Sequence, residues 1–114
     1  MLAARLGLRL VPLPTIDGDV LAAACRSERI RALYVVPTND NPTAMTLDAA
    51  TRQSIAQAAR ANDLAVIEDD VYGALCATCA VPIAALAPER TWYVASVSKT
   101  ISPCLLYTSD AADE

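Results

Sequence analysis

The sequence contains no histidine. Catalysis by Ser-His-Asp or Cys-His groups is therefore excluded, as are histidine-ligated metal sites and a histidine general base. Lysine is nearly as scarce, because Lys99 is the single lysine and every other basic side chain is an arginine. A lysine amine can form a Schiff base with an aldehyde, whereas an arginine guanidinium cannot. Lys99 is therefore the first candidate for a reactive residue.

Long apolar runs and basic patches are also missing. No run approaches the roughly 20 apolar residues that span a bilayer. Arg5 and Arg9 interrupt the apolar start of the chain, so no secretory signal forms there. We therefore expect a cytoplasmic protein without a membrane partner. The net charge is −4, and without a basic cluster this segment gives no indication of nucleic-acid binding.

The four cysteines are not spaced as metal ligands. Cys76 and Cys79 form a lone Cys-x-x-Cys pair, and Cys25 and Cys104 do not supply the second pair that a zinc site requires. A thioredoxin-like redox pair is the alternative, although its usual aromatic and proline context is absent. We expect reduced, partly buried thiols and no bound metal.

The pattern of apolar residues predicts helices and strands in alternation. A chain of 114 residues, 54% of them hydrophobic, can form one small domain. We expect a helix end stopped by Gly7, a helix over 18–29 capped by Asp17, and a helix from Thr46, its N-cap, to about Asn62. Short apolar runs predict strands over 32–36, 64–69 and 91–96, and alternation that meets two prolines predicts a short strand entering a loop over 8–14. This alternation is typical of an α/β fold with a mostly parallel sheet.

Polar side chains follow three of these strands. Asn41 comes after the second strand, Asp69 ends the third and Lys99 follows the fourth, while Tyr72 lies three residues beyond Asp69. In open α/β sheets, ligands bind at the edge formed by the carboxyl ends of the strands. The sequence therefore predicts a small-molecule site that combines an amide, a carboxylate, a phenol and an amine.

Three short motifs carry a resemblance to a known family. PTNDNPTA (37–44), IEDDVYG (67–73) and SVSKT (96–100) resemble, in this order, motifs in the large domain of class I/II aminotransferases, which are pyridoxal phosphate (PLP) enzymes of fold type I. The resemblance covers roughly residues 8–103. It implies part of a three-layer α/β sandwich, with residues 1–103 as a partial PLP-binding domain.

The resemblance also implies roles for individual residues. Lys99 would form a Schiff base with PLP and move the catalytic proton. Asp69 would pair with the pyridine nitrogen, and Asn41 and Tyr72 would bond the phenolic oxygen of the ring. The cofactor phosphate would be bound by Ser96, with Ser98 as a weaker candidate.

The sequence departs from the family after its last motif. Relatives carry a phosphate-binding arginine shortly after the lysine, but this chain has no arginine after Arg90. Ala44 stands where the family usually has glycine. We expect residues 104–114, which are acidic and unlike the family, to be a disordered tail, and the chain to represent an incomplete enzyme with little turnover alone.

Two functions fit the resemblance. The first is an aminotransferase that converts an amino acid into a 2-oxo acid, with PLP lyases and decarboxylases sharing the same residues, and with a homodimer as the parent protein. The alternative is the effector-sensing, aminotransferase-like domain of a GntR/MocR-type transcriptional regulator. A plain α/β fragment without a ligand would require all three motifs to be coincidental.

Overall fold

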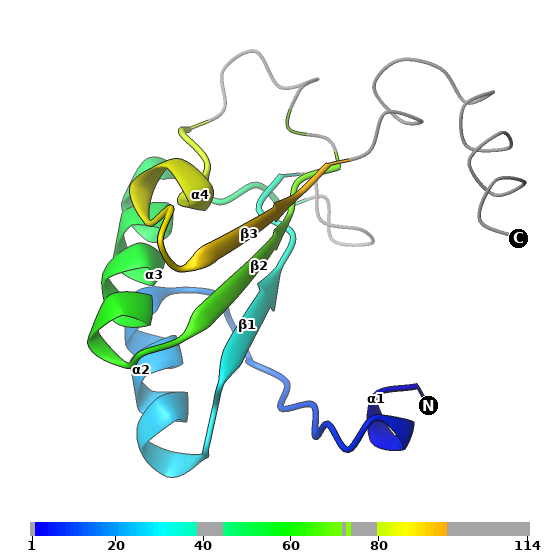
Figure 1. Cartoon of the computed structure of the whole chain (residues 1–114). Helices are drawn as coiled ribbons and strands as arrows, with labels where there is room; N and C mark the ends of the chain where they lie inside the picture. The colour runs from blue at the N-terminus through cyan, green and yellow to red at the C-terminus, as the bar shows by residue number, and fades with distance from the viewer. Residues whose placement is uncertain (1, 39–44, 72, 74–79, 96–114) are drawn as a thin grey trace, which may run out of the picture.

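The computed structural model describes residues 2–38, 45–71, 73 and 80–95. Their elements follow the order α1 (Leu2–Arg5), α2 (Gly18–Ser27), β1 (Ala32–Val35), α3 (Ala49–Ala61), β2 (Ala65–Asp69), α4 (Ile83–Leu86) and β3 (Thr91–Val94). Figure 1 shows α2, α3 and α4 on one side of the sheet, while α1 stands apart near the N-terminus. No helix in these ranges is long and apolar enough to cross a membrane.

The three strands form a parallel sheet in the order β1-β2-β3. The central strand β2 pairs with β1 from Ala32↔Ala65 to Val35↔Glu68, and with β3 from Val66↔Thr91 to Asp69↔Val94. All three carboxyl ends therefore meet at one edge, which confirms the predicted α/β arrangement. At this edge we expected the polar residues to gather.

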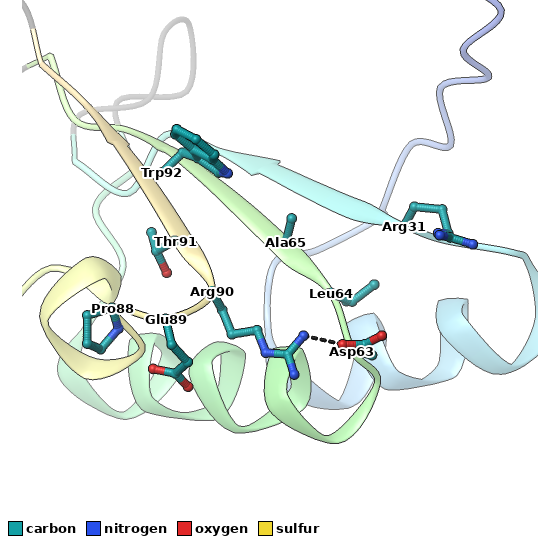
Figure 2. Close-up of a pocket in the computed structure, with 9 residues that line it drawn as sticks. All are labelled: Arg31, Asp63, Leu64, Ala65, Pro88, Glu89, Arg90, Thr91 and Trp92. Carbon is teal, nitrogen blue, oxygen red and sulfur yellow. Dashed lines mark hydrogen bonds and ion pairs between the residues drawn. The ribbon is translucent and has the colours of Figure 1, made fainter.

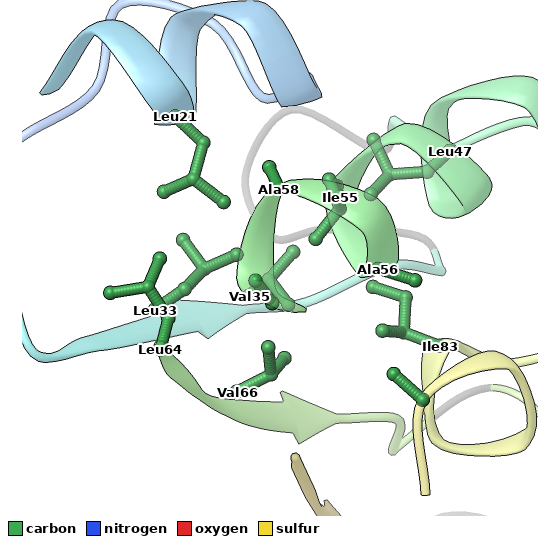
Figure 3. Packing of buried hydrophobic residues seen from close by; sticks show 12 residues of the cluster. Leu21, Leu33, Val35, Leu47, Ile55, Ala56, Ala58, Leu64, Val66 and Ile83 are labelled. Atoms are coloured by element: carbon green, nitrogen blue, oxygen red, sulfur yellow. The ribbon is translucent and has the colours of Figure 1, made fainter. Parts of the chain in front are cut away.

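The core lies between the sheet and α3. Alternate strand residues such as Leu33, Val35 and Val66 point toward the helices, because successive side chains of a strand face opposite ways. Ile55, on α3, is fully buried against them, and Figure 3 shows side chains of α2, α3, α4 and the strands meeting there. The other face of the sheet is exposed, with Trp92 73% accessible.

Two side-chain caps fix where the long helices begin. Asp17 accepts a hydrogen bond from the Val20 backbone N–H at 2.8 Å, as the sequence predicted for α2. The N-cap of α3 is Asp48, whose carboxylate accepts from the Thr51 N–H at 2.8 Å. The expectation that Thr46 caps this helix was wrong, because the helix begins two residues later.

Two further expectations differ from the structure. Residues 8–14 form no strand, since Pro12 and Pro14 lack the N–H groups that a ladder needs and no neighbouring strand pairs with the segment. The sheet therefore has three strands among the described residues. The strand that precedes Asn41 is β1, and the strand that ends at Asp69 is β2. Helix α4 was not predicted, because it is only one turn long.

We predict that Gly18→Ala separates α2 from α3. A Cβ atom at position 18 would lie 2.5 Å from the Ser54 backbone oxygen, and the Gly18 N–H already donates to Ser54 Oγ at 3.0 Å. Overpacking of this kind costs about 1–3 kcal/mol. The free energy of unfolding, measured with urea, should fall by this amount. Hydrogen exchange should show lost protection in α2. The control is Gly7→Ala, whose Cβ would meet no atom within 4 Å and whose strain, from a φ of +74°, lies beside α1 and away from α2. It should leave protection of α2 unchanged, and an equal loss of α2 protection in both variants would contradict the prediction.

Candidate functional site

Asp69 is the one predicted site residue that lies within the described ranges. Asn41, Tyr72, Ser96, Ser98 and Lys99 lie outside the described residues. Thr38 and Ala95, which are described, come shortly after the carboxyl ends of β1 and β3. The described chain therefore leaves β1 and β3 at the edge of the sheet where Asp69 ends β2.

The Asp69 carboxylate ends the central strand with its two oxygens in different environments. Oδ2 accepts a hydrogen bond from the Tyr34 hydroxyl at 2.6 Å. Oδ1 is buried and makes no hydrogen bond to any described residue. A buried carboxylate oxygen without a donor is costly and uncommon. This oxygen therefore suits a ligand that brings an N–H donor to the edge of the sheet, as a protonated pyridine nitrogen does.

Asp70 is adjacent to Asp69 but has different partners. It is 6% exposed, and its Oδ2 accepts from the Tyr93 hydroxyl at 2.7 Å. This hydrogen bond, together with burial, raises the pKa of Tyr93 to about 12. Oδ1 of Asp70 is also buried without a partner in the described residues. Gly73 lies directly over this carboxylate, since a Cβ there would come within 2.0 Å of Oδ2; a larger residue at 73 would displace Asp70.

Glu68 is a buried acid that sequence reasoning missed. Its side chain points toward the helices, is 0% exposed, and accepts from the backbone N–H groups of Ile83 at 2.9 Å and Ala84 at 2.7 Å. It thereby satisfies two free N–H groups at the start of α4. Burial raises the pKa of Glu68, opposed by these two hydrogen bonds. The available signal was an acid at an inward-facing position of an apolar strand.

Arg52 is a buried cation that was also missed. It lies on the core face of α3, 1% exposed, at the helical spacing of Ile55, Ala56 and Ala59. Its guanidinium donates to four acceptors, which are Leu47 O at 2.9 Å, Ala80 O at 3.1 Å, and Pro37 O and Thr38 Oγ1 both at 3.2 Å. These acceptors belong to the segments after β1, before α3 and before α4. One side chain thus joins three segments next to the edge that carries Asp69.

A hollow of about 500 Å³ lies at the opposite edge of the sheet. Figure 2 shows it among the residues before and at the start of β2 and β3, with an ion pair between Arg90 and Asp63. The pairing identifies Arg90 as a surface charge, and it lowers the pKa of Asp63. Because ligands of parallel α/β sheets bind at the carboxyl ends of the strands, we assign the site to the edge near Asp69 and not to this hollow.

We predict that Arg52→Met lowers the free energy of unfolding by about 3 kcal/mol or more, because it leaves buried acceptors without a donor. Arg52→Lys should recover only part of this loss, since an ammonium cannot reproduce the planar fork. Urea unfolding measures both. Arg60→Met, which removes an exposed ion pair between Arg60 on α3 and Glu89, is the control and should cost much less than Arg52→Met, because exposed ion pairs contribute little to stability. Equal losses at positions 52 and 60 would contradict a special role for Arg52.

We predict opposite pH effects for two glutamates. With the pKa of Glu68 raised, the folded protein keeps a proton that the unfolded chain releases above its ordinary pKa of about 4.3. The relevant window begins at the ordinary pKa of the unfolded chain and ends at the raised pKa of the folded chain. As pH rises through it, the stability of the native chain relative to Glu68→Gln should fall, by at most about 1.4 kcal/mol per pH unit.

Glu89 provides the control for this measurement. Its hydrogen bond from Arg60 lowers the pKa of Glu89 to about 2. The native chain should be more stable than Glu89→Gln above the ordinary pKa of glutamate, and this advantage should be lost as pH falls toward 2. Urea unfolding at a series of pH values tests both slopes. A Glu68 difference that stays flat or grows with pH would show that burial does not dominate at Glu68.

Comparison of the sequence with known proteins identifies its family. The family profile "Aminotransferase class I and II" matches residues 3–103. The uncharacterized HTH-type transcriptional regulator YdeF of Bacillus subtilis is 31% identical over 107 residues, covering 90% of this chain and 23% of that protein. The uncharacterized aminotransferase SSO0104 of Saccharolobus solfataricus is 29% identical over 96 residues, covering 82% of this chain and 24% of that protein.

A solved structure agrees with the sequence comparisons. The α-aminoadipate aminotransferase LysN from Thermus thermophilus, complexed with N-(5'-phosphopyridoxyl)-L-leucine, superposes with a TM-score of 0.75 at 29% identity, covering 87% of this chain and 28% of that one. The chain thus spans about a quarter of the length of these relatives. Because the family profile matches most of its length, the chain belongs to the class I and II aminotransferases.

Proposed function

We propose that this chain forms the central part of the PLP-binding domain of an amino acid aminotransferase. The observation that carries the proposal is the Asp69 carboxylate, which ends the central strand of the sheet with a buried oxygen that has no hydrogen-bond partner among the described residues. A carboxylate in this position can keep a pyridine nitrogen protonated. PLP, when bound, supplies an electron-withdrawing ring that stabilises negative charge at the substrate α-carbon.

The remaining roles follow from the positions of the motifs. Lys99 would hold the cofactor through its amine and, when free, move a proton to and from the substrate α-carbon. Asn41 and Tyr72 would donate hydrogen bonds to the phenolic oxygen of the ring. The hydroxyl groups of Ser96 and Ser98 would bind the phosphate. The substrates would be an amino acid and a 2-oxo acid.

The proposal extends to the organisation of the protein. Residues 1–103 would be the part of the large domain present here, in agreement with the family match to residues 3–103. Residues 104–114 would not contribute to the site. The parent protein would be a cytoplasmic homodimer. Without a phosphate-binding arginine after Lys99, the affinity of the chain itself for PLP would rest on Asp69, Lys99 and neutral donors.

A second candidate is the aminotransferase-like domain of a GntR/MocR-type regulator. It is favoured by the match to YdeF, an HTH-type transcriptional regulator, along 90% of this chain. In that setting the same residues would bind PLP and an amino-acid effector without turnover. Amino acids added to the PLP-loaded parent protein, of which this chain would be one part, separate the two candidates, because an aminotransferase releases a 2-oxo acid and an effector domain does not. A helix-turn-helix segment upstream in the gene would also favour the regulator.

We predict that PLP labels Lys99 saturably and that Asp69→Asn weakens this labelling about tenfold or more. A hydrogen bond to a charged group contributes about 1.5–3 kcal/mol, and a neutral amide cannot keep the ring nitrogen protonated. Visible absorbance follows PLP uptake, and borohydride reduction with peptide mass mapping locates the modified amine. Lys99 competes only with the N-terminus, because no other lysine is present.

Asp70→Asn is the matched control, since it alters the neighbouring acid while leaving an oxygen that can accept from Tyr93. It should label like the native chain. Labelling that is confined to the N-terminus, or that does not depend on Asp69, would refute the proposed cofactor site in this chain.

A further inference from the structure

Two tyrosine hydroxyls each hold one of two adjacent carboxylates. The Tyr34 hydroxyl donates to Asp69 Oδ2 at 2.6 Å, and the Tyr93 hydroxyl donates to Asp70 Oδ2 at 2.7 Å. In both acids the second oxygen is buried without a partner among the described residues. The two pairs use the same chemistry in different places, so each can serve as a control for the other.

The pleat of the sheet brings Tyr34 within reach of Asp69. Tyr34 is in register with Ile67 on β2, and Asp69 lies two residues further along the same face. Such diagonal neighbours are about 7–8 Å apart at their Cα atoms, a distance that a tyrosine side chain can span. The phenol thus points from the middle of β1 to the carboxyl end of β2, where the candidate site lies.

We propose that Tyr34 is a positioning residue that orients the Asp69 carboxylate for the ring nitrogen of PLP. This inference rests on the proposed function and names a residue that belongs to none of the three motifs. With Oδ2 occupied by the Tyr34 O–H, Oδ1 is the oxygen left to accept an N–H from the cofactor. Tyr34 itself does not touch the cofactor in this arrangement; it acts through Asp69.

The hydrogen bond matters because a carboxylate turns easily. The terminal torsion of an aspartate is broad and roughly two-fold, so packing alone fixes it weakly. An O–H···O⁻ bond of 2.6 Å is short and charge-assisted, and it defines which oxygen faces the ligand. None of the ion pairs found among the described residues includes Asp69. The phenol is therefore the donor that sets its orientation there.

The structure also indicates that removing this hydroxyl leaves the fold intact. Tyr34 is 61% exposed, outside the cluster of buried core residues. Tyr34→Phe retains the ring and deletes only the O–H group. Tyr93→Phe makes the same change beside Asp70, on a side chain that is 47% exposed. Thermal unfolding of both variants checks that each is folded before binding is measured.

The test compares the native 114-residue chain with Tyr34→Phe, Tyr93→Phe and Asp69→Asn. PLP affinity is measured by absorbance titration, and the yield of the Lys99 adduct by borohydride reduction and mass mapping. We expect Tyr34→Phe to weaken PLP binding about three- to tenfold, which is less than direct loss of a hydrogen bond to a charged group would cause, because Tyr34 acts only by orienting Asp69. Tyr93→Phe should bind like the native chain. In Asp69→Asn, a further Tyr34→Phe change should have little effect, because both act through the same carboxylate.

A second measurement does not depend on the cofactor. In protein labelled with ¹³C-aspartate, the Asp69 carboxyl resonance should move in Tyr34→Phe and stay in place in Tyr93→Phe, whereas the Asp70 resonance should do the opposite. An Asp69 resonance unchanged by Tyr34→Phe would overturn the inference, because the hydrogen bond would then not exist in solution.

The outcomes separate the inference from the proposed function. Saturable, Asp69-dependent PLP binding that is equal in the native chain and Tyr34→Phe would overturn the role of Tyr34 and leave the proposed function standing. An absence of PLP uptake by the native chain would overturn both. Weaker binding in Tyr34→Phe alone, together with the moved Asp69 resonance, would support both.

Discussion

The segments around the candidate site depend on one buried guanidinium. Arg52 is 1% exposed and donates to acceptors in the segments after β1, before α3 and before α4. A buried charge is tolerated only when its donors are satisfied, and here four protein oxygens take that role. A single side chain thus links three segments next to the carboxyl edge of the sheet.

The pleat gives three consecutive acids different partners. Glu68 points toward the helices and caps α4, and Asp69 points to the other face, where Tyr34 holds it. Asp70 lies past the end of β2 and is held by Tyr93. Since neighbouring side chains of a strand face opposite ways, a shift of one residue would exchange these environments. The register between β1 and β2 therefore determines which of these acids faces Tyr34.

The sequence predicts the sheet better than it predicts the polar interior. The apolar runs at 32–36, 64–69 and 91–96 became strands because burial on the sheet dominates their energetics. Residues 8–14 showed a similar pattern, but strand pairing is non-local and no partner was available to them. Asp69 was predicted as a site residue from a motif at a strand end, and in the structure it ends β2. Arg52 and Glu68 were not found, because a charged residue within an apolar face is explained only by acceptors and donors distant in sequence.

The distribution of charges leaves one oxygen of Asp69 without a partner among the described residues. Within the described residues, the buried acids Glu68 and Asp70 are bonded by neutral N–H and O–H donors, and the buried cation Arg52 is directed to carbonyl and hydroxyl oxygens. Had Arg52 formed a bidentate pair with Asp69, both carboxylate oxygens would be occupied. The phenol of Tyr34 bonds to one oxygen of Asp69, and the second oxygen, unpartnered among the described residues, would suit a cationic N–H. This division of partners would serve an aminotransferase and an effector-binding domain equally, because both must first hold the ring nitrogen.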